Sequence, residues 1–131
     1  MASQHGGSAS AEKSSDSRLK ALVEWASKEA GASYAFLLLR DHDTSELQKA
    51  ISYGRAEAPQ GLLAVARWVL SKGEQVCLQG EADAKEIAGS RLEESALPLI
   101  CAPVGSNATP LGVLAMGWPP SAREGFSRWL L

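Results

Sequence analysis

Neither sign of charge is in excess in this 131-residue chain: 13 lysines and arginines stand against 15 aspartates and glutamates, a formal net charge of −2. A nucleic-acid-binding surface needs a basic field to hold phosphates, so we expect no nucleic acid as a partner. Long apolar runs are also lacking. None approaches the roughly 20 residues that span a bilayer, so we expect no membrane partner. What is present, 45% hydrophobic and 21% charged residues, is the usage of an ordinary folded domain.

Cysteine and histidine are scarce. Two cysteines, Cys77 and Cys101, do not make a disulfide framework, and the amino terminus lacks the pattern of a secretory signal, so we expect a reducing, cytoplasmic setting. The histidines are His5 and His42, and in Asp41-His42-Asp43 three adjacent side chains on a turn rarely converge on one ion. Gly-rich phosphate loops, His-Glu-x-x-His motifs and nucleophile elbows are all missing. The sequence therefore predicts no metal site, no catalytic residue and no enzyme, and it requires no cofactor.

The length of the chain predicts one domain, over residues 16–131. Residues 1–15 are Ser, Ala and Gly with scattered charges, and such a stretch cannot bury enough apolar area to offset its ordering entropy. We expect a flexible tail there. Ser15 or Asp16 can cap a helix, whose apolar stripe follows a helical period. The stripe consists of Leu19, Leu22, Val23, Ala26 and Ala30.

Two segments, 34–40 and 111–118, are apolar on both parities, which predicts strands covered on both faces and therefore central in a sheet. Segment 46–53 keeps one polar side, as an edge strand does, and it forms a hairpin with 34–40. The predicted strands are 34–40, 46–53, 75–78, 97–104 and 111–118, and the later helices are 61–72, a short one around 83–88 and a last one from Ser121. Because two pairs of neighbouring strands form hairpins, the predicted fold class is α+β with an antiparallel sheet.

Two stretches in this order resemble the GAF domain family. Residues 66–78 look like the family's helix, turn glycine and following strand. Residues 97–104 and 111–114 are similar to its paired strands, where a proline-containing strand turns back into a Gly-Val-Leu strand. There Gly112 favours close packing of a neighbouring chain segment. Phe126-Ser127 resembles the start of the family's last helix.

The resemblance covers roughly residues 17–131 and implies a GAF/PAS-like, profilin-like sandwich. It has a central antiparallel sheet of five or six strands, the terminal helices on one face, and a ligand-pocket segment, residues 55–96, on the other. It further implies a signalling or regulatory domain that binds a small molecule, dimerises, or does both. The alternative is a ligand-free scaffold for protein assembly. No specific ligand carries over from the family.

A pocket on the sheet would be apolar, with a few polar groups. The strand parity that faces it is not readable from the sequence, so the candidates include both. They are Phe36, Leu37, Leu39, Tyr53, Trp68, Val76, Leu99 and Cys101.

Aromatic residues gather on the two terminal helices. If both helices share one face of the sheet, these rings extend that face into a hydrophobic interface. Such an interface predicts a homodimer. The interface candidates are Trp25, Phe126, Trp129 and Leu130. The other interpretation is that the same rings cover the core of a monomer.

Cys77 and Cys101 fall on neighbouring predicted strands, which makes them redox candidates. A reactive thiolate needs nearby positive charge to lower its pKa, and the sequence neighbours of both cysteines are apolar. Two buried structural thiols are the favoured interpretation. Some GAF relatives reduce methionine sulfoxide with cysteines in the middle segment, and here residues 79–96 contain none. That enzymatic alternative is therefore disfavoured.

Overall fold

The structure is a computed structural model that describes residues 2–118, apart from residues 42, 45, 90, 94–95 and 107–108. Side chains are described from Asp16 onward, with those of Lys49, Glu81, Ala82, Ala84 and Ala88 left out. The helix expected from Ser121 lies outside the described residues.

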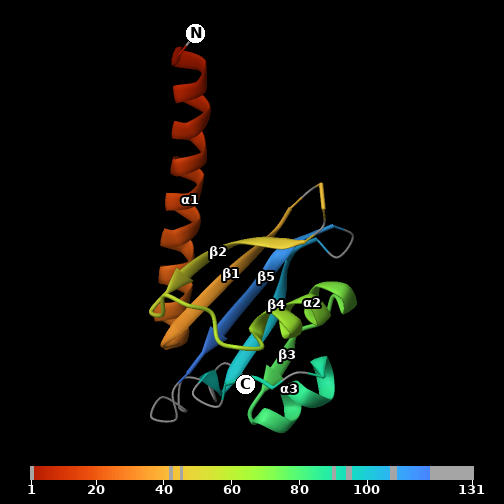
Figure 1. Cartoon of the computed structure of the whole chain (residues 1–131). Helices are drawn as coiled ribbons and strands as arrows, with labels where there is room; N and C mark the ends of the chain where they lie inside the picture. Colours follow the sequence, from red (N-terminus) through yellow and green to blue (C-terminus); the bar gives the residue numbers. More distant parts are fainter. Residues whose placement is uncertain are drawn as a thin grey trace.

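Three helices and five strands make up the described part of the chain (Figure 1). Their sheet order is β2-β1-β5-β4-β3, and every neighbouring pair is antiparallel. The α+β class, the central places of β1 and β5 and the edge place of β2 are thereby confirmed. The elements are α1 (Ala2–Ala30), β1 (Tyr34–Arg40), β2 (Leu47–Tyr53), α2 (Leu62–Lys72), β3 (Val76–Leu78), α3 (Glu81–Ala88), β4 (Leu99–Gly105) and β5 (Pro110–Gly117).

Helix α1 covers one face of the sheet, while α2 and α3 lie on the other (Figure 1). The strands alternate between the two faces, so each face has its own buried cluster. Under α1 the cluster holds Val23, Leu37, Ile51 and Met116, and it ends at Trp118, whose indole Nε1 donates to the carbonyl of Ala30 at 3.0 Å. This bond fixes the end of β5 beside the end of α1.

Helix α1 begins at Ala2, so it extends into residues 1–15, where the sequence predicted a flexible tail. The segment has no proline, and once a helix is nucleated each added residue contributes one hydrogen bond. Composition alone indicated only that the segment has little apolar area to bury. In Figure 1 this part of the helix projects beyond the sheet.

Leu22 does not belong to the packed stripe of α1, which corrects the predicted stripe: 61% of its surface is exposed. The stripe that meets the sheet contains Leu19, Val23, Ala26 and Ala30. Ser27 also lies on that side, fully buried, with its hydroxyl donating to the Val23 carbonyl at 2.6 Å. Since neighbouring residues on a helix are rotated by about 100°, Leu22 cannot share the inward direction of Val23.

The sequence predicted close packing of a neighbouring segment at Gly112, and in the structure that neighbour is β1. A Cβ atom on Gly112 would overlap the carbonyl oxygen of Leu38 in the neighbouring strand. Any side chain at this position would push the two central strands apart.

Candidate functional surfaces

The face of the sheet beneath α2 is filled by side chains. Leu62, Val65, Ala66 and Val69 of α2 have no exposed surface, and they belong to the same buried cluster as Phe36 of the central strand. Protein interiors of this kind contain few voids larger than a water molecule. Beneath the described residues of α2, the region where the family resemblance places a ligand pocket is therefore occupied by the protein's own core.

The eight predicted pocket residues do not lie together. Phe36, Val76, Leu99 and Cys101 are buried on the α2 face, and Trp68 packs against them. Leu37, Leu39 and Tyr53 belong to the cluster on the α1 face. Successive side chains of a strand point to opposite faces, so Phe36 and Leu37 cannot line one pocket. The eight candidates, drawn from both parities because both are apolar, thus divide between the two faces of the sheet.

An ion pair closes the α2 face at one end. The Arg55 guanidinium lies 2.7 Å from a Glu93 carboxylate oxygen, and the other Glu93 oxygen accepts the backbone N–H of Gln60 at 2.7 Å. These contacts tie the loop before α2 to the segment before β4. Arg55 also lies over the Tyr34 ring, 5.8 Å from its centroid. No local sequence pattern predicts this ion pair, because its two residues are 38 positions apart.

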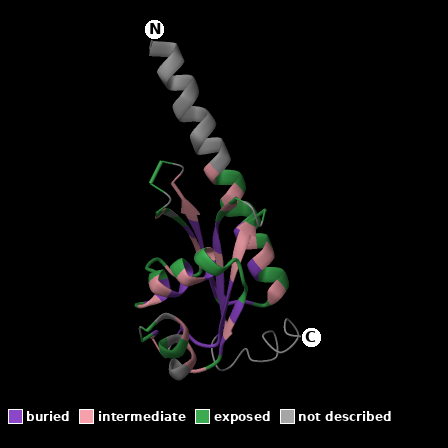
Figure 2. Ribbon diagram, turned by 90° about the vertical axis from the view of Figure 1, so that its right-hand side faces the viewer, coloured by how far each residue is buried: buried purple, intermediate pink, exposed green. Residues whose placement is uncertain are grey.

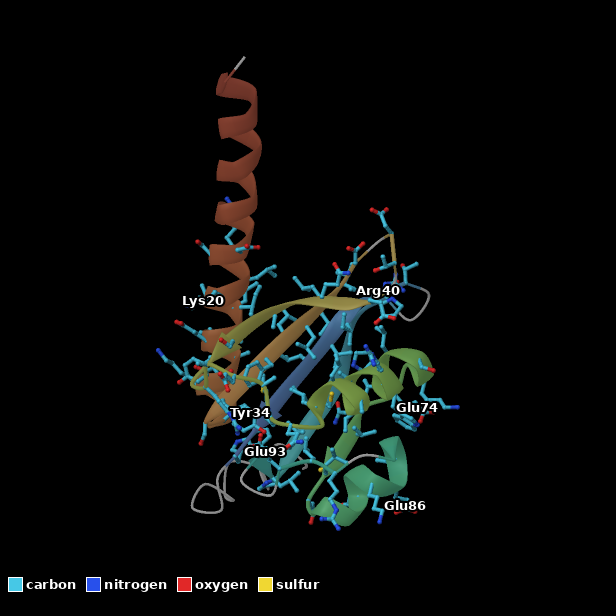
Figure 3. All side chains as sticks on the ribbon, in the orientation of Figure 1. Lys20, Tyr34, Arg40, Glu74, Glu86 and Glu93 are labelled. Carbon is cyan, nitrogen blue, oxygen red and sulfur yellow. The ribbon has the colours of Figure 1, made fainter. Side chains whose placement is uncertain are left out.

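Tyr34 anchors the same end of the sheet (Figure 3). Its hydroxyl donates to the Ala96 carbonyl at 2.6 Å, and burial raises the pKa of the phenol far above its ordinary value. A Cβ atom on Gly117 would overlap the Tyr34 ring. The Tyr34 ring is therefore a structural part of the core. It fits between β5 and the segment ending at Ala96.

The two cysteines lie on adjacent strands but on opposite faces. Val76 is paired with Cys101, and Cys77 is paired with Ile100, so the Cys101 side chain joins the α2 face and that of Cys77 the α1 face. Burial raises the pKa of the Cys101 thiol to about 12. Burial, and then the carboxylate of Asp83, raise the pKa of Cys77. Both thiols are therefore protonated at neutral pH, and they do not face each other as a redox pair.

The described residues were compared in their metal-ligating side chains and in the length and polarity of their helices. No group of three or more His, Cys, Asp and Glu side chains there could hold a metal ion. Within the same residues, every helix is too short or too polar to cross a bilayer.

The outer side of α1 carries a stripe of four exposed residues, which we call the outer stripe: Arg18, Leu22, Trp25 and Glu29. Leu22 and Trp25 are 61% and 64% exposed and are the large apolar residues of the described helix that face solvent. Figure 2 shows the alternation of exposed and covered surface along this helix. The four residues of the outer stripe are spaced by four, three and four positions, which puts all of them on one side of the helix. That spacing is readable in the sequence as a second stripe beside the packed one.

Of the predicted interface residues, Trp25 is on this exposed side, whereas Phe126, Trp129 and Leu130 lie outside the described residues.

At the far end of the sheet from Tyr34 is a hollow of about 280 Å³, which we call the basic hollow. It opens where β1, α2 and the β4–β5 hairpin meet. Its lining consists of Arg40, Leu70, Ser71, Lys72, Gly73, Pro103 and Pro110. No local sequence pattern predicts the basic hollow, since its lining residues come from four separate segments.

Comparison with known proteins supports the fold. No family model and no curated protein matches the chain. Among solved structures, a hypothetical protein from S. aureus is similar with a TM-score of 0.58 and 15% identity, over 78% of this chain and 93% of that one. The GAF domain of an Acinetobacter phosphoenolpyruvate-protein phosphotransferase is similar with a TM-score of 0.55 and 16% identity, over 82% of this chain and 72% of that one. The chain thus has a GAF-like fold, as the motifs indicated.

Proposed function

We propose that this chain is a non-catalytic regulatory module that acts by pairing with a second copy of itself through the outer stripe of α1. The observation that carries the proposal is the stripe itself: two exposed apolar side chains, Leu22 and Trp25, with a base at one end and an acid at the other. Tryptophan on an exposed helix face is typical of the centre of an interface.

The outer stripe is complementary to itself. When two α1 helices lie antiparallel about a twofold axis midway between Leu22 and Trp25, each Leu22 meets the partner's Trp25, and each Arg18 meets the partner's Glu29. Such an interface is isologous, because the same patch serves both subunits. A parallel arrangement would instead set Arg18 against the partner's Arg18 and Glu29 against the partner's Glu29. The charges therefore favour the antiparallel pair.

The size of the stripe limits the affinity. In this register only residues 17–30 of each helix overlap, about 20 Å of helix. An interface of this length, with two large side chains from each subunit, buries less than the roughly 1,200 Å² typical of stable complexes. We therefore expect a dimer that dissociates in the micromolar range or above, as suits a module that regulates by changing its association state.

The filled α2 face supports assembly over the pocket-based alternative. A domain that sensed a ligand beneath α2 would have to displace Leu62, Val65 and Val69 from a cluster in which they have no exposed surface. Each such side chain stabilises the fold by about 1.5–3 kcal/mol through burial. Association through an already exposed stripe requires no such rearrangement.

Light scattering coupled to size exclusion tests the proposal, over about 5 to 300 µM protein. Leu22→Ala should shift the monomer–dimer equilibrium toward monomer. Leu111→Ala is the matched control, because Leu111 is similarly exposed, at 54%, but lies on β5. A wild-type chain that is monomeric throughout this range, or an equal effect of both substitutions, would contradict the proposal.

A further inference from the structure

Two cationic side chains contribute to the lining of the basic hollow. Arg40 and Lys72 supply guanidinium and ammonium groups to its lining, and Ser71 adds a hydroxyl. Among the described residues, the lining includes no aspartate or glutamate. Charged donors of this kind form their strongest hydrogen bonds with carboxylates and phosphates.

Neither cation is neutralised within the part of the chain that the structure describes. The ion pairs found there join Arg55 to Glu93 and Arg67 to Glu46. Asp41 directly follows Arg40, yet its carboxylate is used by its own turn, where Oδ1 accepts the backbone N–H groups of Asp43 and Thr44. Both cations can therefore pair with an anionic ligand.

Three apolar residues also contribute to the lining of the hollow. Leu70, Pro103 and Pro110 are half-buried around it, and the two prolines have no backbone N–H to offer a ligand. At about 280 Å³, the space is slightly smaller than the roughly 300 Å³ at which the range for small-molecule sites begins. It suits one anionic group joined to one ring or short aliphatic chain.

We propose that the basic hollow binds a small organic anion, a carboxylate or phosphate ester with a single apolar group. Its anionic head lies between Arg40 and Lys72, and its apolar part lies on Leu70, Pro103 and Pro110. Arg40, the less exposed cation, provides the larger share of binding through a bidentate contact. Because Lys72 and Gly73 end α2, a bound anion links the end of this helix to β1 and to the β4–β5 hairpin.

The site lies apart from the outer stripe, since none of its lining residues belongs to α1. Binding here neither requires nor excludes the dimer, so the two proposals can fail separately.

An NMR titration of the full ¹⁵N-labelled chain tests the site with phenyl phosphate and benzoate as probes. Saturable shifts should centre on the amides of Ser71, Lys72 and Gly73. Arg40→Gln should weaken binding about tenfold or more, and Lys72→Gln about threefold. Arg67→Gln is the matched control, because it removes the same charge from the outer surface of α2, where Arg67 is paired with Glu46. It should leave the affinity unchanged.

Two further probes divide the ligand into its parts. Inorganic phosphate should bind more weakly than phenyl phosphate, and benzyl alcohol, which lacks the charge, more weakly than benzoate. The relative affinities of benzoate and phenyl phosphate decide between a carboxylate and a phosphate head. Equal affinity for inorganic phosphate and phenyl phosphate would contradict the proposed apolar contact with Leu70, Pro103 and Pro110. Absence of saturation by either probe up to about 10 mM, or equal weakening by Arg67→Gln and Arg40→Gln, would overturn the site.

Discussion

The carboxylate of Glu93 lies 2.7 Å from the guanidinium of Arg55 and joins two segments that are distant in the sequence. The pair is about one-third exposed, with side-chain exposures of 30% and 33%. Partial burial strengthens an ion pair over one in open solvent, where salt and water screen the charges. The chain contains a natural comparison, because Arg67 and Glu46 form a pair at 3.3 Å that is 59% and 56% exposed.

A double-mutant cycle with Arg55→Gln and Glu93→Gln should therefore give a coupling of about 0.5–1 kcal/mol in the free energy of unfolding. The same cycle with Arg67→Gln and Glu46→Gln should give about 0.3 kcal/mol or less. Urea denaturation at low salt measures both. Equal couplings would mean that the Arg55–Glu93 pair does not hold the two segments together.

Gly117→Ala is expected to destabilise the protein by about 1–3 kcal/mol, because the new methyl group would overlap the Tyr34 ring on the neighbouring strand. The test is whether the destabilisation by Gly117→Ala depends on the Tyr34 ring. In a Tyr34→Ala background, where the ring is gone, Gly117→Ala should have an effect below about 1 kcal/mol. Urea unfolding of the single and double variants measures this coupling. Additive effects would show that Gly117 is required for another reason.

Much of the fold was predictable because its strands differ in character. Segments 34–40 and 111–118 are apolar on both parities, and they are the central strands β1 and β5. Gly112 indicated where they approach each other.

The candidate sites were less predictable, and the reasons are physical. Two-sided hydrophobicity, the signal that placed β1 in the centre, conceals which of Phe36 and Leu37 faces α2. Leu22 fits a broad apolar stripe in the sequence, and only the rotation of α1 on the sheet shows that Leu22 faces outward. Arg40 and Lys72 line one hollow only because β1 and α2 end at the same end of the sheet. This relationship has no local sequence pattern.

The burial of Cys101 predicts a loss of stability at alkaline pH. Its pKa is raised from 9.0 to about 12 in the folded chain, so above pH 9 the unfolded chain releases a proton that the folded chain retains. The contribution is present in full below the unfolded pKa and declines as the pH rises toward the folded one. By pH 10 the loss is about 1.4 kcal/mol relative to pH 8.

Cys101→Ala isolates this contribution. The difference in unfolding free energy between wild type and the variant should shrink by about 1.4 kcal/mol from pH 8 to pH 10, whatever the variant's baseline stability. The buried Tyr34 phenol has a raised pKa in both proteins, so its effect cancels in the difference. Guanidinium titrations at several pH values provide the measurement. A difference that is constant with pH would contradict the predicted burial of the thiol.

The antiparallel register of the proposed dimer makes a prediction that a parallel register does not. Arg18→Glu alone should weaken the dimer, since the new carboxylate meets the partner's Glu29, and Glu29→Arg alone should weaken it through two facing arginines. The double variant Arg18→Glu/Glu29→Arg restores opposite charges and should recover dimerisation to within about threefold of wild type. In a parallel dimer each position faces its own copy, so every variant keeps like charges together. Sedimentation equilibrium at low and high salt distinguishes the two: recovery at low salt that fades at high salt supports the antiparallel pair, and four proteins of equal affinity would exclude it.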